Sequence, residues 1–230
     1  MAKGVSLRPE LIVFDCDGVL VDSEPIANRV MAEAITALGW PLTSADCIAR
    51  FKGHHFDTIA AAIEERLGRP PPEDWLSDLR AATDTAFTRE LKPVPGVLKA
   101  LDAVAASGIA TCVASQGPLE KMAVSLGVTG LRPRFEGRIF SAYQVPRGKP
   151  HPDLFLFAAE CMGVAPRACT VIEDSPLGVT AAKAAGMGVL GFAPEGDGAD
   201  LAAAGANLFR DMAELPGLLG LERGTGRRCV

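Results

Sequence analysis

The chain has 230 residues, of which 48% are hydrophobic and 22% are charged, and its mean hydropathy is +0.20. This balance is typical of a globular protein and excludes a disordered or low-complexity chain. The net charge of −5 argues against sequence-independent binding to nucleic acid, which requires a broadly basic surface. One local pocket on an acidic protein can still hold an anion.

Neither a membrane span nor an export signal is expected from the sequence. No apolar run approaches the roughly 18 residues that cross a bilayer. The apolar stretch 11–14 is too short for a signal peptide and runs directly into Asp15. The six cysteines include no C-x-x-C pair, which favours reduced thiols over a disulfide framework or a zinc site. We therefore expect a cytoplasmic protein with no membrane or nucleic-acid partner.

The first predicted element is a buried strand at 11–15, which is apolar and β-branched and ends at an acidic turn. No strand pattern follows over 25–91. Helical patterns cover this segment instead, at 26–38, 46–51, 57–67 and 75–90. A Pro- and Gly-containing linker closes the segment at 93–96. We expect residues 22–91 to form a helical cap domain, inserted into a core domain of residues 1–21 and 92–230.

Helical and strand patterns alternate in the rest of the chain. In order they are a helix at 97–106, a strand at 109–115, a helix at 119–126, a short strand at 139–140, a helix at 153–162, a strand at 169–173, a helix at 177–185 and a strand at 188–192. Such alternation predicts right-handed βαβ units around a parallel sheet. The expected fold class is α/β, a Rossmann-like parallel sheet flanked by helices, with an all-helical insertion after the first strand.

An acidic pair lies at the end of the first strand. Asp15 and Asp17 are two positions apart, so both can face one site if the chain stays extended. Ligands of open α/β sheets bind outside the carboxyl ends of the strands. Two close carboxylates disfavour joint ionisation unless a cation intervenes, and Mg²⁺ is the natural candidate because it takes oxygen ligands. The alternative is a solvated acidic turn that ends the strand.

Polar groups at further strand ends favour a phosphoryl site. Ser115 ends the predicted strand 109–115, Lys149 lies in a loop before a helix, and Glu173 and Asp174 end the strand 169–173. A phosphoryl group bound to Mg²⁺ needs carboxylates for the metal, a hydroxyl donor for its oxygens and a cation to offset its charge. Alone, Ser115 could be a helix N-cap, Lys149 a solvated charge and the acidic pair a turn. Their joint occurrence at strand ends favours the phosphoryl site.

These residues resemble the four motifs of the haloacid dehalogenase-like hydrolase superfamily. The matching strings are DCDGVLVDSE at 15–24, Ser115, KPHPD at 149–153 and EDSPLG at 173–178, in the family's order. The helical insertion is similar to the cap of the β-phosphoglucomutase-like branch. The second aspartate and the acidic pair are typical of the Mg²⁺-dependent phosphotransfer members, so dehalogenase chemistry is disfavoured.

The resemblance implies a role for each acidic residue of the motifs. Asp15 would be the nucleophile that attacks phosphorus and forms an aspartyl phosphate. Asp17 would be the general acid toward the leaving oxygen and then the base toward the incoming water. Asp15, the backbone carbonyl of Asp17, and Asp174 would hold Mg²⁺, with Glu173 nearby.

The resemblance also implies which residues contact the substrate. Ser115 and Lys149 would hold the phosphoryl oxygens, and Lys149 would also offset the charge of Asp15. The remaining substrate contacts would come from the cap loop, from the residue after Ser115 and from the end of the first motif. These residues are Lys52, Gly53, Gln116 and Ser23.

Two local strings indicate the substrate class. The mutases of this branch carry an arginine in the cap loop that helps to hold a second phosphate, but Phe56 stands at that position. After Ser115 the chain has Gln116-Gly117-Pro118 and then Lys121-Met122, which look more like bacterial sugar-phosphate phosphatases of the 6-phosphogluconate type. We therefore expect a monomeric, Mg²⁺-dependent phosphatase that hydrolyses a small sugar or sugar-acid phosphate ester. A β-phosphoglucomutase-like phosphomutase and a non-catalytic regulatory protein are the alternatives.

Overall fold

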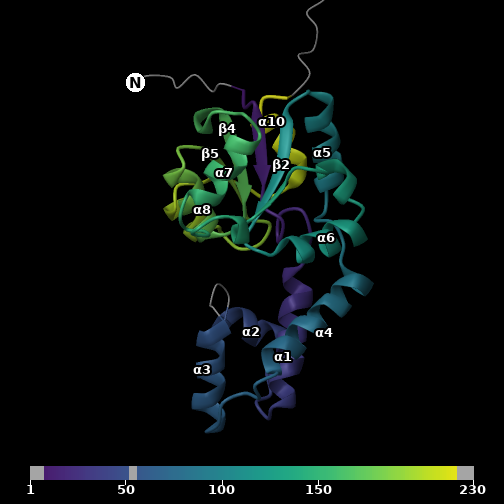
Figure 1. Ribbon diagram of the computed structural model, residues 1–230, viewed down its shortest axis with the longest axis vertical. Coiled ribbons are helices and arrows are strands. Elements are labelled where there is room, and N and C mark those ends of the chain that lie inside the picture. Colours follow the sequence, from purple (N-terminus) through teal and green to yellow (C-terminus); the bar gives the residue numbers. More distant parts are fainter. Residues whose placement is uncertain (1–7, 52–55, 222–230) are drawn as a thin grey trace, which may run out of the picture.

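The computed structural model describes residues 8–51 and 56–221, which form an α/β part and a helical part. A six-stranded, fully parallel sheet with the order β3-β2-β1-β4-β5-β6 forms the centre of the α/β part (Figure 1). The strands are β1 (Leu11–Phe14), β2 (Ala110–Ser115), β3 (Ile139–Ser141), β4 (Cys169–Glu173), β5 (Gly188–Phe192) and β6 (Asn207–Phe209). The strand order reverses at β1, which lies between β2 and β4, and such a switch point is where α/β sheets bind ligands.

Alternating side chains of β1 pack in two separate hydrophobic clusters, one on each face of the sheet. Ile12 and Phe14 pack with the helices on one face of the sheet, whereas Leu11 and Val13 pack with those on the other. The first face is covered by α5 (Val97–Ala106), α6 (Leu119–Val128) and α10 (Leu215–Leu218). The second is covered by α7 (Asp153–Cys161), α8 (Pro176–Ala184) and α9 (Ala199–Ala203). With all four β1 residues fully buried, the strand is held firmly and its carboxyl end has a fixed position.

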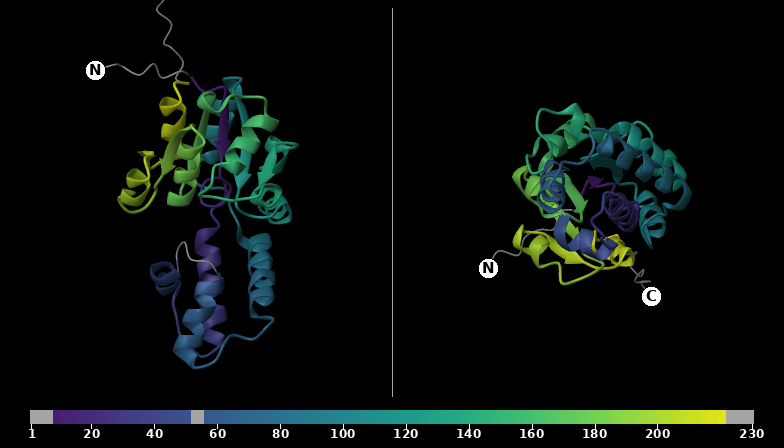
Figure 2. Two further views of the ribbon diagram at one scale, coloured as in Figure 1. Left: turned by 60° about the vertical axis from the view of Figure 1, so that its left-hand side comes forward. Right: turned by 90° about the horizontal axis from the view of Figure 1, so that it is seen from below.

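Four helices between β1 and β2 form the helical part, which lies beyond the carboxyl ends of the strands (Figures 1 and 2). They are α1 (Glu24–Ala37), α2 (Ser44–Phe51), α3 (Phe56–Leu67) and α4 (Trp75–Glu90). These helices have a hydrophobic cluster of their own, with Ile35, Cys47 and Ile63 fully buried in it. Two chain segments join them to the sheet side by side, because Val21 pairs with Pro93 and the Asp22 amide donates to the Lys92 carbonyl at 3.0 Å.

The structure confirms the predicted fold class, including the helical insertion after the first strand. Every predicted strand and helix is present, with ends that differ by at most two residues. The sequence did not predict β6, α9 or α10, which follow the last predicted strand. Among the described residues, no helix is both long and apolar enough to cross a membrane.

Candidate active site

The loop after β1 places Asp15 and Asp17 in different surroundings. Gly18 has a φ of 75° and its amide donates to the Val21 carbonyl at 2.9 Å, so the chain turns back directly after Asp17. A Cβ atom on Gly18 would overlap the Asp174 carboxylate, and only glycine therefore fits this turn. β1 ends at Phe14, so both aspartates lie in the segment directly beyond the strand, at the sheet edge.

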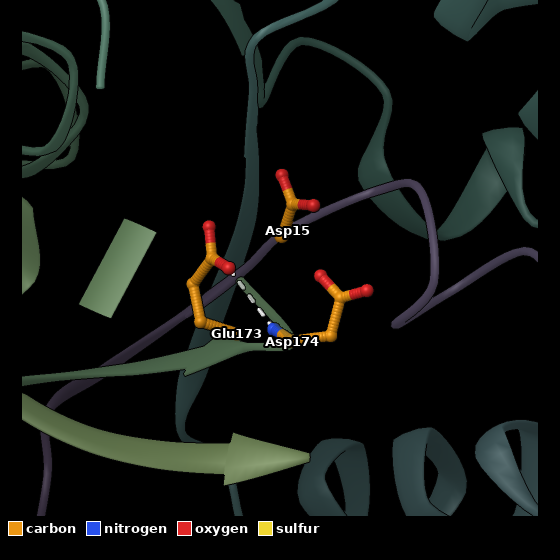
Figure 3. A group of neighbouring side chains, drawn as sticks. All are labelled: Asp15, Glu173 and Asp174. Atoms are coloured by element: carbon orange, nitrogen blue, oxygen red, sulfur yellow. Dashed lines mark hydrogen bonds between the residues drawn. The ribbon is translucent and has the colours of Figure 1, made fainter. Parts of the chain in front are cut away.

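Three carboxylates meet at the ends of the neighbouring strands β1 and β4 (Figure 3). Asp15, Glu173 and Asp174 each offer an oxygen, and these three oxygens all lie within 4.8 Å of one another. Asp15 is 7% exposed and Glu173 is fully buried. Buried like charges at this distance repel one another unless cations or protons offset them, so the group is a candidate site for a divalent cation.

Glu173 holds the surrounding backbone in place. One carboxylate oxygen accepts hydrogen bonds from the amides of Asp174 and Ser175 and from the Ser175 hydroxyl, each at 2.9 Å. The first of these bonds is drawn in Figure 3. The other oxygen lies 2.5 Å from the Lys149 ammonium. The absence of a side chain at Gly178 is required here, because a Cβ would overlap the Glu173 carboxylate.

Lys149 neutralises part of the acidic group. Its ammonium lies 2.7 Å from Asp15 and 2.5 Å from Glu173, and its side chain is only 5% exposed. The ammonium also lies 5.1 Å from the centre of the Phe155 ring. Burial alone would lower the pKa of Lys149, but the Asp15 and Glu173 carboxylates outweigh it and raise the pKa above its usual value. The lysine therefore stays charged inside the site.

The pKa values of the two other carboxyls reflect this crowding. Burial and the Glu173 charge raise the pKa of Asp15 to about 7, even though Lys149 acts in the opposite direction. Burial, with Glu173 and Asp15 adding to it, raises the pKa of Asp174 well above its usual value. One lysine is thus insufficient for three carboxylates, and a further cation would favour their ionised forms.

Asp17 is held on both oxygens. Its Oδ1 accepts a hydrogen bond from the Ser23 hydroxyl at 2.8 Å, and its Oδ2 lies 2.8 Å from the ammonium of Lys121 on α6. Ser23 is buried and precedes α1. It was expected to contact the substrate, but in this structure its hydroxyl donates to Asp17. The Asp17 carboxylate is not part of the group formed by Asp15, Glu173 and Asp174.

Ser115 and Gln116 follow β2 at the same edge of the sheet. Ser115 is 2% exposed and its hydroxyl accepts a hydrogen bond from the Gly117 amide at 3.2 Å. It is not a helix cap, because Pro118 occupies the N-cap position of α6. The side-chain Oε1 of Gln116 accepts a hydrogen bond from the Lys149 backbone amide at 3.0 Å. Gln116 therefore supports the loop that carries Lys149.

A cleft of about 960 Å³ lies between the α/β part and the helical part. Gly18 and Asp174 line its floor, Arg29 and Ile48 line it from the helical part, and the loop after β5 forms another wall.

The expected substrate residues Lys52 and Gly53 lie outside the described residues. Lys121 is the site residue that the sequence analysis missed as a partner of Asp17. Its only signal was the short string Lys121-Met122 after the second motif.

Comparison with known proteins gives a consistent result. The model of the family described as haloacid dehalogenase-like hydrolase matches residues 9–186. The 6-phosphogluconate phosphatase of Escherichia coli K12 is 31% identical over 212 residues, which cover 92% of this chain and 95% of that protein. Hexitol phosphatase B of the same strain is 31% identical over 177 residues, 76% of this chain and 79% of that one.

A solved structure extends the similarity to three dimensions. A haloacid dehalogenase family hydrolase of Deinococcus radiodurans, solved with bound phosphate and sodium, matches this chain with a TM-score of 0.81 and 33% sequence identity. The match covers 93% of this chain and 97% of that one. The four predicted motifs, the parallel sheet with its helical insertion and the family match agree over most of the sequence. The chain therefore belongs to the haloacid dehalogenase-like hydrolase family.

Proposed function

We propose that this protein is a Mg²⁺-dependent phosphatase that hydrolyses sugar or sugar-acid phosphates through an aspartyl phosphate on Asp15. The observation that carries the proposal is the arrangement at the ends of β1 and β4. There, Asp15 shares a buried group with Asp174 and Glu173 and lies 2.7 Å from the Lys149 ammonium. A phosphoryl transfer site requires such carboxylates for a metal, a nucleophile and a fixed cation.

The broader expectation of an enzyme that hydrolyses phosphate monoesters is confirmed by the family match and by the two phosphatases among the relatives. The finer substrate class is inferred from their names, which refer to 6-phosphogluconate and to hexitol phosphates. Both are polyhydroxylated compounds with a terminal phosphate. The open cleft above Asp174 has room for a substrate of this size.

The donor set fits Mg²⁺. It consists of carboxylate oxygens, which hard divalent cations prefer. Asp15 is buried and Asp174 is half-buried, and both have raised pKa values that a nearby cation would lower. We propose that Asp15, Asp174 and the backbone carbonyl of Asp17 hold the ion. Glu173 would stand behind these ligands, because both of its oxygens already accept hydrogen bonds. When bound, Mg²⁺ supplies positive charge that polarises the phosphoryl oxygens.

The described residues can perform the remaining steps. An oxygen of Asp15 attacks phosphorus, and the bond from phosphorus to the ester oxygen breaks as Asp17 donates a proton to that oxygen. Asp17 then takes a proton from the water that attacks the aspartyl phosphate, which releases phosphate and restores Asp15. Lys149 offsets the negative charge in both steps, and the buried Ser115 hydroxyl would donate a hydrogen bond to a phosphoryl oxygen.

The helical part would act as a cap in this scheme. We propose that residues 22–91 form the cap domain and that residues 1–21 and 92–230 form the core. The two adjacent connections near Val21 and Pro93 would permit a hinge motion that closes the cleft and excludes water. The monomeric state and the cytoplasmic location stay predictions of the sequence.

Phosphate release from a panel of phosphate esters tests the proposed function. With Mg²⁺ present we expect turnover of several sugar or sugar-acid phosphates, complete loss of activity with EDTA and recovery when excess Mg²⁺ is added. Equal activity in EDTA would contradict the metal assignment. Isomerised sugar phosphate in place of free phosphate would identify a phosphomutase instead.

A further inference from the structure

Lys121 is a partly buried lysine that has no role in the chemistry proposed above. It lies in the first turns of α6, and its ammonium is 2.8 Å from Oδ2 of Asp17. The side chain of Lys121 is 31% exposed and that of Asp17 is 28% exposed, so the pair is largely shielded from solvent. Ion pairs of this kind are screened less by salt than fully exposed pairs.

The second oxygen of Asp17 is also occupied. Ser23 donates its hydroxyl proton to Oδ1 at 2.8 Å, so the carboxylate has a donor on each side. Two donors on opposite oxygens fix the rotation of the carboxylate plane, which a single hydrogen bond would leave free. The orientation of Asp17 therefore depends on the position of the Lys121 ammonium.

The helical part fixes the position of that ammonium. The Phe87 ring of α4 lies 5.7 Å from Nζ of Lys121, within the range of a cation–π contact. Phe87 is 1% exposed and packs in the same cluster as Met122, the residue after Lys121. Lys121 is thus held between the end of α4 and the Asp17 carboxylate.

Lys121 and Lys149 serve different carboxylates. Lys149 contacts Asp15 and Glu173, whereas Lys121 contacts Asp17. Removal of Lys121 would therefore leave the partners of the nucleophile in place. This separation allows the effect of Lys121 on proton transfer to be measured apart from the attack on phosphorus.

We propose that Lys121 is a positioning residue for Asp17, and that Phe87 holds its ammonium in the position that aims Asp17 at the ester oxygen. The inference rests on the proposed function, because it assigns Lys121 to the proton-transfer step of that reaction. Proton transfer requires hydrogen-bond distance and alignment, so a misdirected carboxyl slows departure of the leaving group. Esters with a good leaving group depend less on this proton.

The Lys121→Met variant tests the proposal, because methionine keeps most of the apolar side chain and removes the ammonium. The two substrates are p-nitrophenyl phosphate and the sugar phosphate that the wild-type protein turns over fastest. We expect kcat for the sugar phosphate to fall about 10- to 100-fold, with KM nearly unchanged. For p-nitrophenyl phosphate we expect kcat to fall less than about threefold, since its leaving group needs little protonation. Lys99→Met, at an exposed position of α5, is the matched control and should leave both reactions unchanged.

Three further variants make the test specific. Lys121→Arg should restore part of the lost kcat, since arginine can both pair with a carboxylate and stack on an aromatic ring. Phe87→Leu keeps an apolar side chain without the ring, and should give a smaller loss with the same dependence on the leaving group. In an Asp17→Ala background, Lys121→Met should change kcat less than about twofold, because the group that it positions is gone.

Several outcomes would overturn the proposal. Equal losses for both esters, a rise in KM with kcat preserved, or full additivity of Lys121→Met with Asp17→Ala would each show that Lys121 does not act through Asp17. If a thermal melt shows that Lys121→Met is unfolded, the Lys121→Arg and Phe87→Leu variants provide the test. A wild-type ratio of kcat for the two esters in both variants would overturn the proposal. Absence of wild-type turnover on every ester would refute the proposed function itself, whereas wild-type turnover with unchanged selectivity in the variants would refute only this inference.

Discussion

The α/β part and the helical part differ in how firmly their side chains near the cleft are held. In the α/β part, Lys149 is 5% exposed and its ammonium pairs with Asp15 and Glu173, and Glu173 also accepts hydrogen bonds from the Asp174 and Ser175 amides. In the helical part, Ile48 is 41% exposed and Arg29 is 39% exposed, and among the described residues Arg29 forms ion pairs with Glu33 and Glu90 of the same part. The preorganised groups therefore belong to the sheet edge, and the adaptable surface belongs to the helices.

This difference suggests a division of labour. Groups that are fixed before substrate arrives can stabilise charge without reorganisation, which suits the transfer of a phosphoryl group. Exposed groups on the helical part suit recognition of the rest of the substrate. Changes in the α/β part should thus alter turnover of every ester, whereas changes in the helical part should alter the choice among esters.

The largest effect is expected from Asp15→Asn. The substitution keeps the size of the side chain but removes the attacking carboxylate, so kcat should fall by several orders of magnitude on all esters, as for other lost nucleophiles. Initial rates over a range of substrate concentrations measure the loss. A thermal melt should show a folded protein, and near wild-type turnover would refute the role of Asp15.

Asp17→Ala should have the next largest effect, and the size of the effect should depend on the leaving group of the ester. Loss of a general acid and base costs about 10²- to 10⁴-fold in rate, and the loss should be smaller for p-nitrophenyl phosphate than for a sugar phosphate. Parallel kcat measurements on both esters test this. An identical loss on the two would indicate that Asp17 has only a structural role.

Glu173→Gln tests whether the buried hydrogen bonds of the α/β part support its rigidity. The variant weakens the contact with Lys149 and leaves a buried donor poorly satisfied, so we expect about 1–3 kcal/mol less free energy of unfolding. Denaturant titration measures this change. Glu64→Gln, at an exposed position of α3, is the control and should stay within about 0.5 kcal/mol of wild type. Equal stability of the two variants would contradict the account of Glu173.

The smallest effect is expected from Lys52→Ala, which lies between α2 and α3 in the sequence and outside the described residues. From the sequence we predict that Lys52 holds the distal polar or anionic group of the substrate. The variant should therefore raise KM for phosphorylated sugars or sugar acids by about tenfold or less, the size of one exposed charge contact, and should spare p-nitrophenyl phosphate. An equal change on both esters, or no change on either, would show that Lys52 does not select the substrate.

The strand ends of the α/β part were predictable because they follow from local patterns. Runs of buried β-branched residues end at Asp15, Ser115 and Glu173, and parallel strands bring their carboxyl ends to one edge. β6 escaped prediction because it has three residues, of which only Phe209 is fully buried. Unlike β3, which begins with Ile139, β6 contains no β-branched residue, so its sequence carries no strand signal.

The bonds of Asp17 could not be predicted from spacing. Spacing predicts that Asp15 and Asp17 lie at one sheet edge, but it does not show that the chain turns at Gly18 or that Ser23 donates to Asp17. The contact with Lys121 depends on how α6 packs against α4, which is a tertiary property. Local sequence thus identified the acidic residues, while packing decided which partner each one has.

Chemical trapping of the intermediate tests whether Asp15 forms an aspartyl phosphate during turnover. The protein is mixed with its fastest sugar phosphate and Mg²⁺, quenched with acid during turnover and treated with borohydride, which reduces an acyl phosphate to an alcohol. If Asp15 forms an aspartyl phosphate, the peptide mass spectrum should show homoserine at position 15, and none there when substrate is omitted. Active enzyme with an unmodified Asp15, or with the modification on another residue, would contradict it.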